Sequence, residues 1–326
     1  MGIKITGTGY YVPERILTNS DLEGMVETSD EWIVTRTGIR ERHIAGEGTI
    51  TSDLAARAGE RAIGSAGIRR EDIDLLIVST MTPDMATPST AVFVQRKLGL
   101  RPCMCLDIEA ACTGLLYGLD IVHAMLASGQ RRTALLIGAE RMSSVTNWQD
   151  RTTCVLFGDA ASAVVVQADP GWDGDFYLQA EVSANSEGAD VLQIPGFGTA
   201  CPATPENIAG HMNSVKMNGQ KTFQMAIAAM SGSCQRVLEA SGVSVDSLRW
   251  VIPHQANDRI ISAVSARLGL GDRVYRNVDR FGNTSSASIG ICLDELNRSG
   301  RLERGDLVLL TAFGAGMTWA SQMIRW

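Results

Sequence analysis

Cys112 lies where the sequence changes from a strand-like to a helix-like pattern. In DIEAACTGLLYGLDIV (107–122), the thiol follows two alanines and precedes a threonine and a glycine, and apolar residues then recur at helical spacing. A helix N-terminus carries about half a positive charge and free N–H groups, which should lower the pKa of a thiol placed there. Small neighbours also leave space for an electrophilic carbonyl group. We therefore predict that Cys112 is a nucleophile, although a small buried side chain would also be compatible with the position.

His254 and Asn283 are the other two candidates for catalysis. His254 ends the apolar run VIPH (251–254), and the carboxyl ends of buried strands border the ligand-binding crevice in α/β proteins. Asn283 lies in DRFGNTSSAS (279–288), whose small polar residues resemble the elbow around Cys112. Taken alone, His254 is equally compatible with a hydrogen-bonded core histidine, and Asn283 with a turn or cap residue. The remaining histidines lie in sequences that indicate a loop, a helix surface and a glycine-rich loop: His43, His123 and His211.

A cysteine, a histidine and an asparagine fit two chemistries. In a thiol protease the histidine is the base and the asparagine orients it, but the papain-like sequence signature is absent here. In carbon–carbon bond formation on thioesters, the cysteine is acylated and the other two side chains donate hydrogen bonds to an enolate oxygen. A neutral amide suits that role because an aspartate would repel the anion. The glycine-rich AFGAG (312–316) then offers backbone N–H groups to a tetrahedral oxyanion.

The elements that must position these residues alternate between strands and helices. Continuous apolar runs predict strands at 74–80, 103–108, 133–139, 161–168, 248–254, 273–278 and 306–314. Apolar residues three and four apart predict helices at 52–67, 91–99, 114–129, 222–242, 258–269 and 287–300. This order is typical of an α/β fold with sheets that are buried on both faces.

The sequence also contains a repeat of this α/β pattern. The segment LDIEAACTGLLYGLDIVHAMLASGQRRTALLIGAE resembles NVDRFGNTSSASIGICLDELNRSGRLERGDLVLLTAFGAG, since each reads as strand, small-residue elbow, helix, basic turn and apolar strand. We therefore expect two similar halves, residues 1–170 with the cysteine and residues 171–326 with the histidine and asparagine. If the halves face each other, the two elbows meet and Cys112 lies opposite the loops of His254 and Asn283.

Composition narrows the class of protein. The 326 residues carry a net charge of −7, which disfavours nucleic-acid binding, and no apolar run reaches the roughly 18 residues of a membrane span. The first residues lack the apolar core of a secretory signal, so we expect a cytoplasmic protein. The seven cysteines are scattered, which indicates small buried side chains rather than disulfides. GTGYYV (7–12) lacks the third glycine of a dinucleotide loop, and the acidic residues show no metal-ligand spacing, so we expect no metal and no bound redox cofactor.

Several motifs are spread over essentially the whole chain: TSDEWIVTRTGIRERH (28–43), EAACTG (109–114), LFGDAAS (156–162), KMNGQKTF (216–223), VIPHQAN (251–257), DRFGNTSSAS (279–288) and AFGAGMTW (312–319). In combination they resemble the β-ketoacyl-acyl-carrier-protein synthase III family of thiolase-like condensing enzymes. The resemblance implies a duplicated thiolase-like fold in five αβαβα layers and a homodimer.

The resemblance also implies a two-stage acyltransferase reaction that initiates fatty acid synthesis. Cys112 takes an acyl group from acyl-CoA, and malonyl-acyl carrier protein then loses CO₂. His254 and Asn283 hold the resulting enolate, whose carbon attacks the acyl thioester to give a 3-oxoacyl carrier protein. The implied oxyanion and chamber residues, besides the amide of Cys112, are Ala315, Phe157 and Phe313. Acyl-CoA is a substrate in this reaction, and no other cofactor is implied.

Four alternative functions differ in which of the predicted site residues they require. A related condensing enzyme of secondary metabolism would keep the fold but use another acyl donor or acceptor. A plain acyl transferase is expected to lose His254 and Asn283, and a noncatalytic subunit that binds acyl carrier protein is expected to lose Cys112. A thiol protease is the last alternative.

The resemblance assigns further residues to substrate binding. The implied CoA-binding residues are Trp32, Arg36, Arg151 and Gln220. Gln220 stands where the family often has asparagine. Arg259 and Arg267 lie eight residues apart on about one helical face, where they could meet an acidic carrier protein. Thr87 aligns with the residue that closes a short acyl pocket from the partner subunit in some members, and its small size predicts a longer or branched primer.

Overall fold

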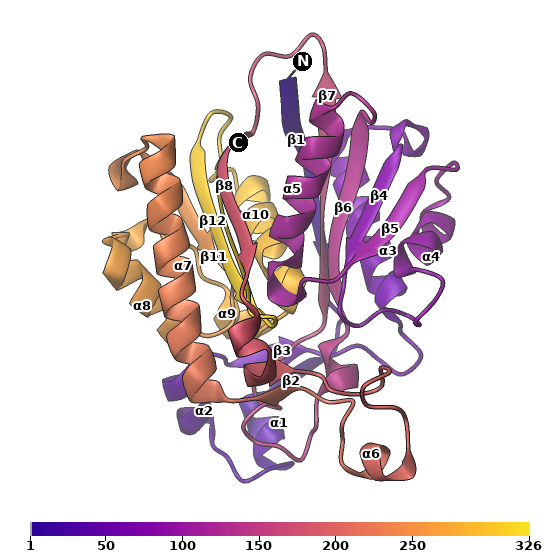
Figure 1. Ribbon diagram of the computed structural model, residues 1–326, viewed down its shortest axis with the longest axis vertical. Coiled ribbons are helices and arrows are strands. Elements are labelled where there is room, and N and C mark those ends of the chain that lie inside the picture. Colours follow the sequence, from indigo (N-terminus) through magenta and orange to yellow (C-terminus); the bar gives the residue numbers. More distant parts are fainter. Residues whose placement is uncertain (1) are drawn as a thin grey trace.

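The computed structural model describes residues 2–326, which form two β-sheets and the helices that cover them (Figure 1). The first sheet contains, in spatial order, β1 (Gly2–Tyr11), β7 (Ala160–Asp169), β6 (Thr133–Glu140), β4 (Leu75–Ser79) and β5 (Met104–Ile108). The second sheet contains β8 (Tyr177–Ala184), β13 (Thr318–Arg325), β12 (Leu307–Gly314) and β11 (Trp250–Pro253). Because β4 is parallel to β5 and β6, and β11 is parallel to β12, the loops that follow these strands gather at one edge of each sheet.

Helices form three layers around the two sheets. The outer layer on the first sheet consists of α3 (Thr51–Ala66) and α4 (Thr90–Leu98), and the outer layer on the second consists of α7 (Gly219–Ser241) and α8 (Asp258–Leu268) (Figure 1). The central layer consists of α5 (Gly114–Ala127) and α10 (Ser288–Arg298). Their apolar faces join strands of both sheets in one core cluster. The order of layers confirms the expected five-layered αβαβα fold.

The burial of the strands explains their apolar sequences. Every residue of β4 and β6 is buried, because helices cover both faces of the first sheet. On the outer face, α3 buries a stripe of small residues that includes Ala58 and Ala62. A Cβ atom at Gly9 of β1 would lie 2.5 Å from the backbone nitrogen of Ala62, so the close contact between this helix and strand requires glycine.

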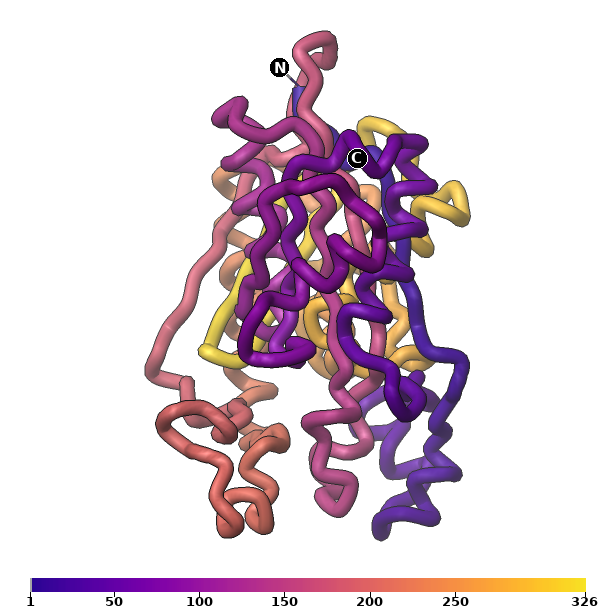
Figure 2. Tube along the Cα trace, turned by 90° about the vertical axis from the view of Figure 1, so that its right-hand side faces the viewer, coloured from indigo at the N-terminus to yellow at the C-terminus, as the bar shows by residue number. Residues whose placement is uncertain are grey.

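Short elements fill the end of the molecule where the candidate site lies. They are β2 (Ile16–Thr18), α1 (Asn19–Glu23), α2 (Asp30–Thr37), β3 (Glu41–His43), β9 (Leu192–Gln193), α6 (Pro205–Ala209), β10 (Lys216–Met217) and α9 (Val278–Phe281). Figure 2 shows three segments that extend below the sheets, around residues 20–40 in indigo, 145–155 in magenta and 190–215 in rose. These segments supply walls to the cavity described below.

One strand predicted in the second half does not form. Residues 273–278, expected to form a strand, make only a single parallel bridge between Val274 and Val251. The chain turns instead into α9, which leads to Asn283. The prediction also omitted β1, β8 and β13, because glycine and polar residues interrupt their apolar pattern.

The two sheets fall on either side of the expected boundary between the halves. The first sheet ends with Asp169 of β7, and the second begins with Tyr177 of β8. The sheets nevertheless share the core cluster around α5 and α10. The division into residues 1–170 and 171–326 therefore stays a prediction about the repeat.

Candidate active site

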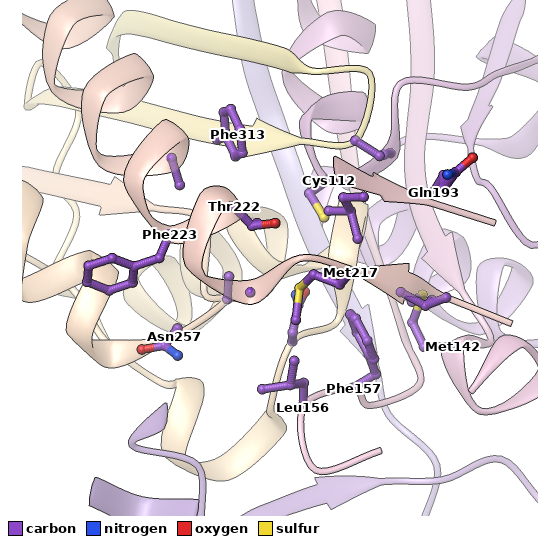
Figure 3. A pocket seen from close by; sticks show the side chains of 18 of the residues that line it. Cys112, Met142, Leu156, Phe157, Gln193, Met217, Thr222, Phe223, Asn257 and Phe313 are labelled. Atoms are coloured by element: carbon purple, nitrogen blue, oxygen red, sulfur yellow. The ribbon is translucent and has the colours of Figure 1, made fainter. Parts of the chain in front are cut away.

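A cavity of about 900 Å³ lies between elements of both sheets. Cys112, His254 and Asn283 all line it, so the structure brings the three predicted residues together. Figure 3 shows the thiol of Cys112 in this cavity, with Phe313 and Phe157 on opposite sides of it in the view. Most of the surrounding side chains are apolar, which limits the access of water to the thiol.

Cys112 lies in the turn between β5 and α5, which we call the first elbow (Glu109–Gly114). Ala111 has a φ of 45°, which is uncommon for a residue with a side chain. The side chain of Glu109 accepts a hydrogen bond from the Ala111 backbone N–H at 3.0 Å and supports this conformation. At the end of β12, a Cβ atom on Gly314 would lie 2.9 Å from the Cys112 nitrogen. The close approach of this strand end fixes where Cys112 meets the cavity.

The thiol of Cys112 does not have the lowered pKa that its sequence position suggested. The residue is 8% exposed, and burial raises the pKa of the thiol to about 12, although a hydrogen bond from Ser285 acts in the opposite direction. The expectation is wrong because removal of water from the thiolate outweighs the stabilising effect of the turn. The helix itself begins only at Gly114, two residues after the thiol.

His254 follows β11 and is almost entirely buried. Its Nδ1 lies 2.7 Å from the hydroxyl oxygen of Ser288, and the backbone N–H of Gln255 donates to the same oxygen at 3.5 Å. The short contact fits a serine hydroxyl that donates to Nδ1, and on this basis we assign the imidazole proton to Nε2. Nε2 has no hydrogen-bond partner within residues 2–326. Burial lowers the pKa of His254 to about 3, so the ring is a neutral hydrogen-bond donor near pH 7.

Asn283 begins the second elbow (Asn283–Ser288), which leads into α10. Its backbone N–H donates to Leu156 O at 2.8 Å, and its Oδ1 accepts a hydrogen bond from the backbone N–H of Ser285 at 2.9 Å. The second of these bonds leaves the amide nitrogen as the free end of the side chain, without a partner in the part of the chain that the structure describes. Asn283 and His254 therefore present two neutral donors beside one thiol.

The predicted oxyanion and chamber residues also line the cavity. Phe157 and Phe313 are each 5% exposed, and Phe157 forms a parallel bridge with Asn283. Ala315 directly follows Gly314, the residue that approaches the Cys112 nitrogen. The role of the Ala315 amide as an oxyanion donor stays a prediction.

Most of the predicted CoA-binding residues line the same cavity. Trp32, Arg36 and Gln220 contribute to its walls. The guanidinium carbons of Arg36 and Arg151 each lie 4.5 Å from the ring centroid of Trp32, which is half-buried on α2. Arg151 thus contacts the indole ring but is not among the cavity-lining residues.

The remaining predicted residues lie at or beyond the edge of the cavity. Arg259 and Arg267 are exposed on α8, and only Arg259 lines the cavity, with its guanidinium carbon 5.4 Å from the Phe223 ring centroid. Thr87 is exposed in the loop before α4 and lies outside the cavity walls of its own subunit. A role for Thr87 in the acyl pocket therefore requires a second subunit.

Sequence reasoning missed residues that support the site from behind. Ser288 contacts Nδ1 of His254, and the Ser285 hydroxyl donates to Glu140 at 3.3 Å. Glu140 carried a usable signal, since it is a lone carboxylate at the end of an apolar strand, and the two serines lie within a predicted elbow. Met142, which lines the cavity, carried none because it resembles any apolar residue.

The fold and the cavity together define a class of protein. Within residues 2–326, no three histidine, cysteine, aspartate or glutamate side chains are grouped so that they could hold a metal ion. No helix in this part of the chain is long and apolar enough to cross a membrane.

Five αβαβα layers, with a cysteine at one elbow and histidine and asparagine from the other half, are the architecture of thiolase-like condensing enzymes.

Comparisons with known proteins specify the family. The model of the 3-oxoacyl-[acyl-carrier-protein] synthase III family matches residues 106–186, and that of its C-terminal region matches residues 238–326. A β-ketoacyl-[acyl-carrier-protein] synthase III from Caldanaerobacter subterraneus subsp. tengcongensis is 47% identical over 99% of this chain and 97% of its own length. The crystal structure of 3-oxoacyl-[acyl-carrier-protein] synthase III from Aquifex aeolicus is 42% identical, with a TM-score of 0.92 and complete coverage of both chains. The priming β-ketosynthase of the R1128 polyketide pathway is 33% identical, with a TM-score of 0.93 over 99% of this chain and 96% of its own.

The chain belongs to the β-ketoacyl-acyl-carrier-protein synthase III family, as its motifs predicted. It is an acyltransferase and an initiating condensing enzyme of fatty acid synthesis. The alternative in secondary metabolism is not favoured, because relatives named β-ketoacyl-[acyl-carrier-protein] synthase III reach 49% identity while the polyketide enzyme is 33% identical.

Proposed function

We propose that Cys112 carries the acyl group in a two-stage condensation, with acyl-CoA as the donor and malonyl-acyl carrier protein as the acceptor. In the first stage the thiolate attacks the thioester carbonyl carbon, and CoA leaves. In the second stage the malonyl group loses CO₂, and the enolate carbon attacks acyl-Cys112 to release 3-oxoacyl carrier protein. The observation that carries this proposal is the convergence of one thiol and two neutral donors on one cavity.

The two donors suit an enolate better than they suit the malonyl carboxylate. His254 donates from Nε2 and Asn283 from its amide nitrogen to the oxygen that becomes negative as CO₂ leaves. Because both donors are neutral, they do not bind the ground-state carboxylate as a cation would. The apolar walls near Phe157 and Phe313 raise the free energy of that carboxylate further. Since loss of CO₂ generates the carbon nucleophile without a redox change, we propose that the reaction needs no cofactor besides its substrates.

Substrates enter past Trp32 and α8 in this proposal. An indole with guanidinium groups on its ring suits a purine base and the phosphates of CoA, and Arg36, Arg151 and Gln220 complete this region. Arg259 and Arg267 give α8 exposed positive charge beside the cavity. Their local positive charge attracts an acidic carrier protein, although the net charge of the whole chain is −7.

We also propose a homodimer that forms across β5. This strand is one of the two edge strands of the first sheet, and exposed edge strands are usually paired or covered. Exposed apolar side chains lie on it and on the elements just before it, namely Met85, Val92 and Met104, which are 48%, 41% and 40% exposed. In such a dimer, Thr87 of the partner subunit would border the acyl pocket. The cytoplasmic location stays a prediction.

A panel of radiolabelled acyl-CoAs tests the proposed chemistry. We expect one or more donors to label the peptide that contains Cys112, and Cys112→Ser to reduce stable labelling by at least about a hundredfold, because a neutral serine is a much weaker nucleophile. Cys201→Ser, which changes a thiol outside the cavity, should retain the label. Addition of malonyl-acyl carrier protein should then release CO₂. Absence of label at Cys112 with every donor would overturn the proposal, and label without CO₂ release would reduce it to plain acyl transfer.

A further inference from the structure

Two cysteines that the condensation does not use lie side by side at an edge of the first sheet. Cys103 directly precedes β5, and Cys105 is the second residue of this strand. Their Sγ atoms are 3.7 Å apart, and Cys105 Sγ also lies 3.6 Å from the backbone oxygen of Cys103. Both residues are half-buried, although the sequence had indicated buried side chains. The contact thus brings two nucleophilic atoms together outside the cavity that holds Cys112.

The two thiols project from the same face of the extended chain. Side chains two residues apart in a strand point to the same side, and the side chain between them points to the other. From α4, Gln95 Nε2 donates to Cys103 Sγ at 3.6 Å. Met104, between the cysteines, instead contacts Arg131, whose Nη2 lies 3.8 Å from its Sδ. The thiol pair therefore lies on the face of the sheet that carries α4, where it packs against the apolar cluster of that face.

The spacing of the pair is suited to a disulfide bond. A rise of about 3.2–3.4 Å per residue places the Cα atoms of residues two apart at about 6.4–6.8 Å. Bonded cysteines have Cα atoms about 4.4–6.8 Å apart, so the strand falls at the upper end of this range. The sulfur atoms of Cys103 and Cys105 have to close from 3.7 Å to about 2.05 Å. A bond at the limit of the range is more easily reduced than an unstrained one, which suits a reversible modification.

A small oxidant has access to this pair. Cys105 forms part of the wall of a second pocket of about 580 Å³, together with Pro83 and Met85. Cys112, in comparison, is only 8% exposed. A second subunit that pairs along β5 would contact backbone N–H and C=O groups in the plane of the sheet, whereas side chains stand out of that plane. The proposed dimer and access to the thiols are therefore compatible.

Hydrogen bonds favour the thiolate form of Cys103. The contact with Cys105 lowers the pKa of the Cys103 thiol, burial opposes this shift, and the hydrogen bond from Gln95 supports it. The same contact, together with burial, raises the pKa of the Cys105 thiol. Burial raises the pKa of the Cys112 thiol to about 12. Because the thiolate is the reactive form of cysteine, Cys103 should react with an oxidant before Cys112 does.

We propose that Cys103 and Cys105 form a redox-active dithiol, which hydroperoxides such as hydrogen peroxide oxidise to an intramolecular disulfide. The Cys103 thiolate attacks one oxygen of hydrogen peroxide, the O–O bond breaks, and a sulfenic acid and hydroxide are formed. The hydroxide takes the proton of the Cys105 thiol and becomes water. The Cys105 thiolate then attacks the Cys103 sulfur and expels a second hydroxide, which becomes water with the proton that Cys103 had released. Two thiols together lose two electrons, and the peroxide is reduced to two water molecules.

Peptide mapping of the full-length protein after brief treatment with hydrogen peroxide tests the proposal. The remaining thiols are alkylated in denaturant, and a protease that cuts after glutamate separates the pair from Cys112, because Glu109 lies between them. We expect the peptide of Cys103 and Cys105 to lose two hydrogen atoms and both alkyl groups, at a rate at least about tenfold above the oxidation of Cys112. Dithiothreitol should restore both thiols.

Single variants assign the two steps to the two residues. In Cys105→Ser the sulfenic acid on Cys103 has no partner, so we expect dimedone to trap it there. In Cys103→Ser, dimedone should trap at least about tenfold less at Cys105, because this thiol has lost the neighbour that forms the sulfenic acid. Cys201→Ser is the matched control, since it removes another half-buried thiol, and the disulfide should form as in the wild type.

The wild-type protein alone can overturn the proposal, so the test does not depend on whether a variant folds. The dithiol is wrong if the pair stays reduced at peroxide concentrations that oxidise Cys112. A disulfide that links two subunits, seen as a dimer on a non-reducing gel, would exclude the intramolecular bond. Equal trapping by dimedone in the two variants would exclude the assigned order of steps. None of these measurements uses acyl-CoA, so a failure of the dithiol leaves the acyl-carrier role of Cys112 unaffected.

Discussion

The first and second elbows share a backbone conformation that is rare for residues with side chains. Ala111 and Ser285 have φ values of 45° and 49°. In each elbow a side chain two residues earlier accepts a hydrogen bond from this residue's backbone N–H: Glu109 Oε1 at 3.0 Å in the first and Asn283 Oδ1 at 2.9 Å in the second. A short turn and a central helix then follow in both. The two halves therefore present the same frame to the cavity from opposite sides.

The side chains at matched positions differ. Cys112 lines the cavity, whereas its counterpart Ser286 turns into the protein and donates to Glu140 at 2.8 Å and to Ser79 O at 3.2 Å. The positive φ values of Ala111 and Ser285 match Cys112 with Ser286, so Asn283 lies three positions before the counterpart of the thiol. The comparison shows that the two elbows share a backbone conformation but carry different functional side chains. One half contributes the nucleophile and the other contributes the hydrogen-bond donors.

The largest effect is expected from a change that makes the second elbow resemble the first. Asn283→Asp keeps the side-chain oxygen that holds the Ser285 N–H but replaces the free amide with a second carboxylate oxygen. We expect condensation to fall about a thousandfold, because one donor is lost and a negative charge faces the enolate. Acylation of Cys112 should persist. Release of labelled CO₂ from malonyl-acyl carrier protein, measured beside acyl labelling, separates the two stages.

Glu109→Gln makes the reciprocal change in the first elbow and serves as the comparison. Glutamine keeps an oxygen for the Ala111 N–H, and we expect condensation to change by less than about tenfold, since this residue has no donor role toward the enolate. Equal losses in the two variants would mean that a disturbed elbow, and not a lost enolate donor, explains the effect of Asn283→Asp. An Asn283→Asp protein that condenses at the wild-type rate would exclude the enolate role.

A smaller effect is expected at Ser288, which orients the histidine of the second half. Ser288→Ala leaves Nδ1 of His254 without its donor, so the ring proton is free to occupy either nitrogen. We expect about a tenfold loss of condensation, in line with the roughly 1–3 kcal/mol that an unsatisfied buried group costs. Ser288→Thr keeps a hydroxyl and should lose less. Nitrogen-15 chemical shifts of the imidazole report the tautomer directly, and a proton that remains on Nε2 in Ser288→Ala would show that the serine does not set it.

Local patterns were sufficient to predict an α/β fold in two halves and the meeting of three residues, whereas the five layers were implied by the resemblance of the motifs to a known family. Cys112, His254 and Asn283 lie at the ends of predicted strands or the starts of predicted helices, and the repeat indicates that the two elbows face each other. The hydrogen-bond partners of Glu140 could not be predicted from local patterns, since Ser285 is 145 positions away and the contact depends on how the halves pack. The pKa of the Cys112 thiol could not be predicted either, because the burial of this thiol depends on a cavity that elements of both halves enclose.

The strand predicted at residues 273–278 does not form for a different reason. Apolar residues there predicted a strand, but a strand forms only where a neighbour offers a free edge in register. In the first sheet β5 pairs with β4 along its whole length, whereas in the second sheet the corresponding segment touches β11 at a single bridge. The chain then turns into α9 and delivers Asn283 to the cavity. In the half that supplies the donors, residues 273–278 therefore form no counterpart of β5.

The smallest expected effect concerns Gly114, the residue of the first elbow that matches Ser288. A Cβ atom at Gly114 would lie 1.7 Å from Ser79 Oγ, which has no hydrogen-bond partner within residues 2–326. In the second half a serine fits the matching position, because the side chain it meets is the imidazole of His254. We expect Gly114→Ala to lower the free energy of unfolding by about 1–2 kcal/mol, since the crowding outweighs the better helix propensity of alanine.

Urea denaturation of a double-variant cycle tests this steric explanation. Ser79→Ala removes the first atom that the new methyl group meets, so the double variant Ser79→Ala/Gly114→Ala should regain more than half of the stability lost in Gly114→Ala. Because Ser79 Oγ donates to nothing in the described chain, Ser79→Ala alone should change stability by less than about 1 kcal/mol. If the effects of the two single changes simply add, the glycine is not required by Ser79. The difference between the elbows at this position would then have to arise from the approach of another group.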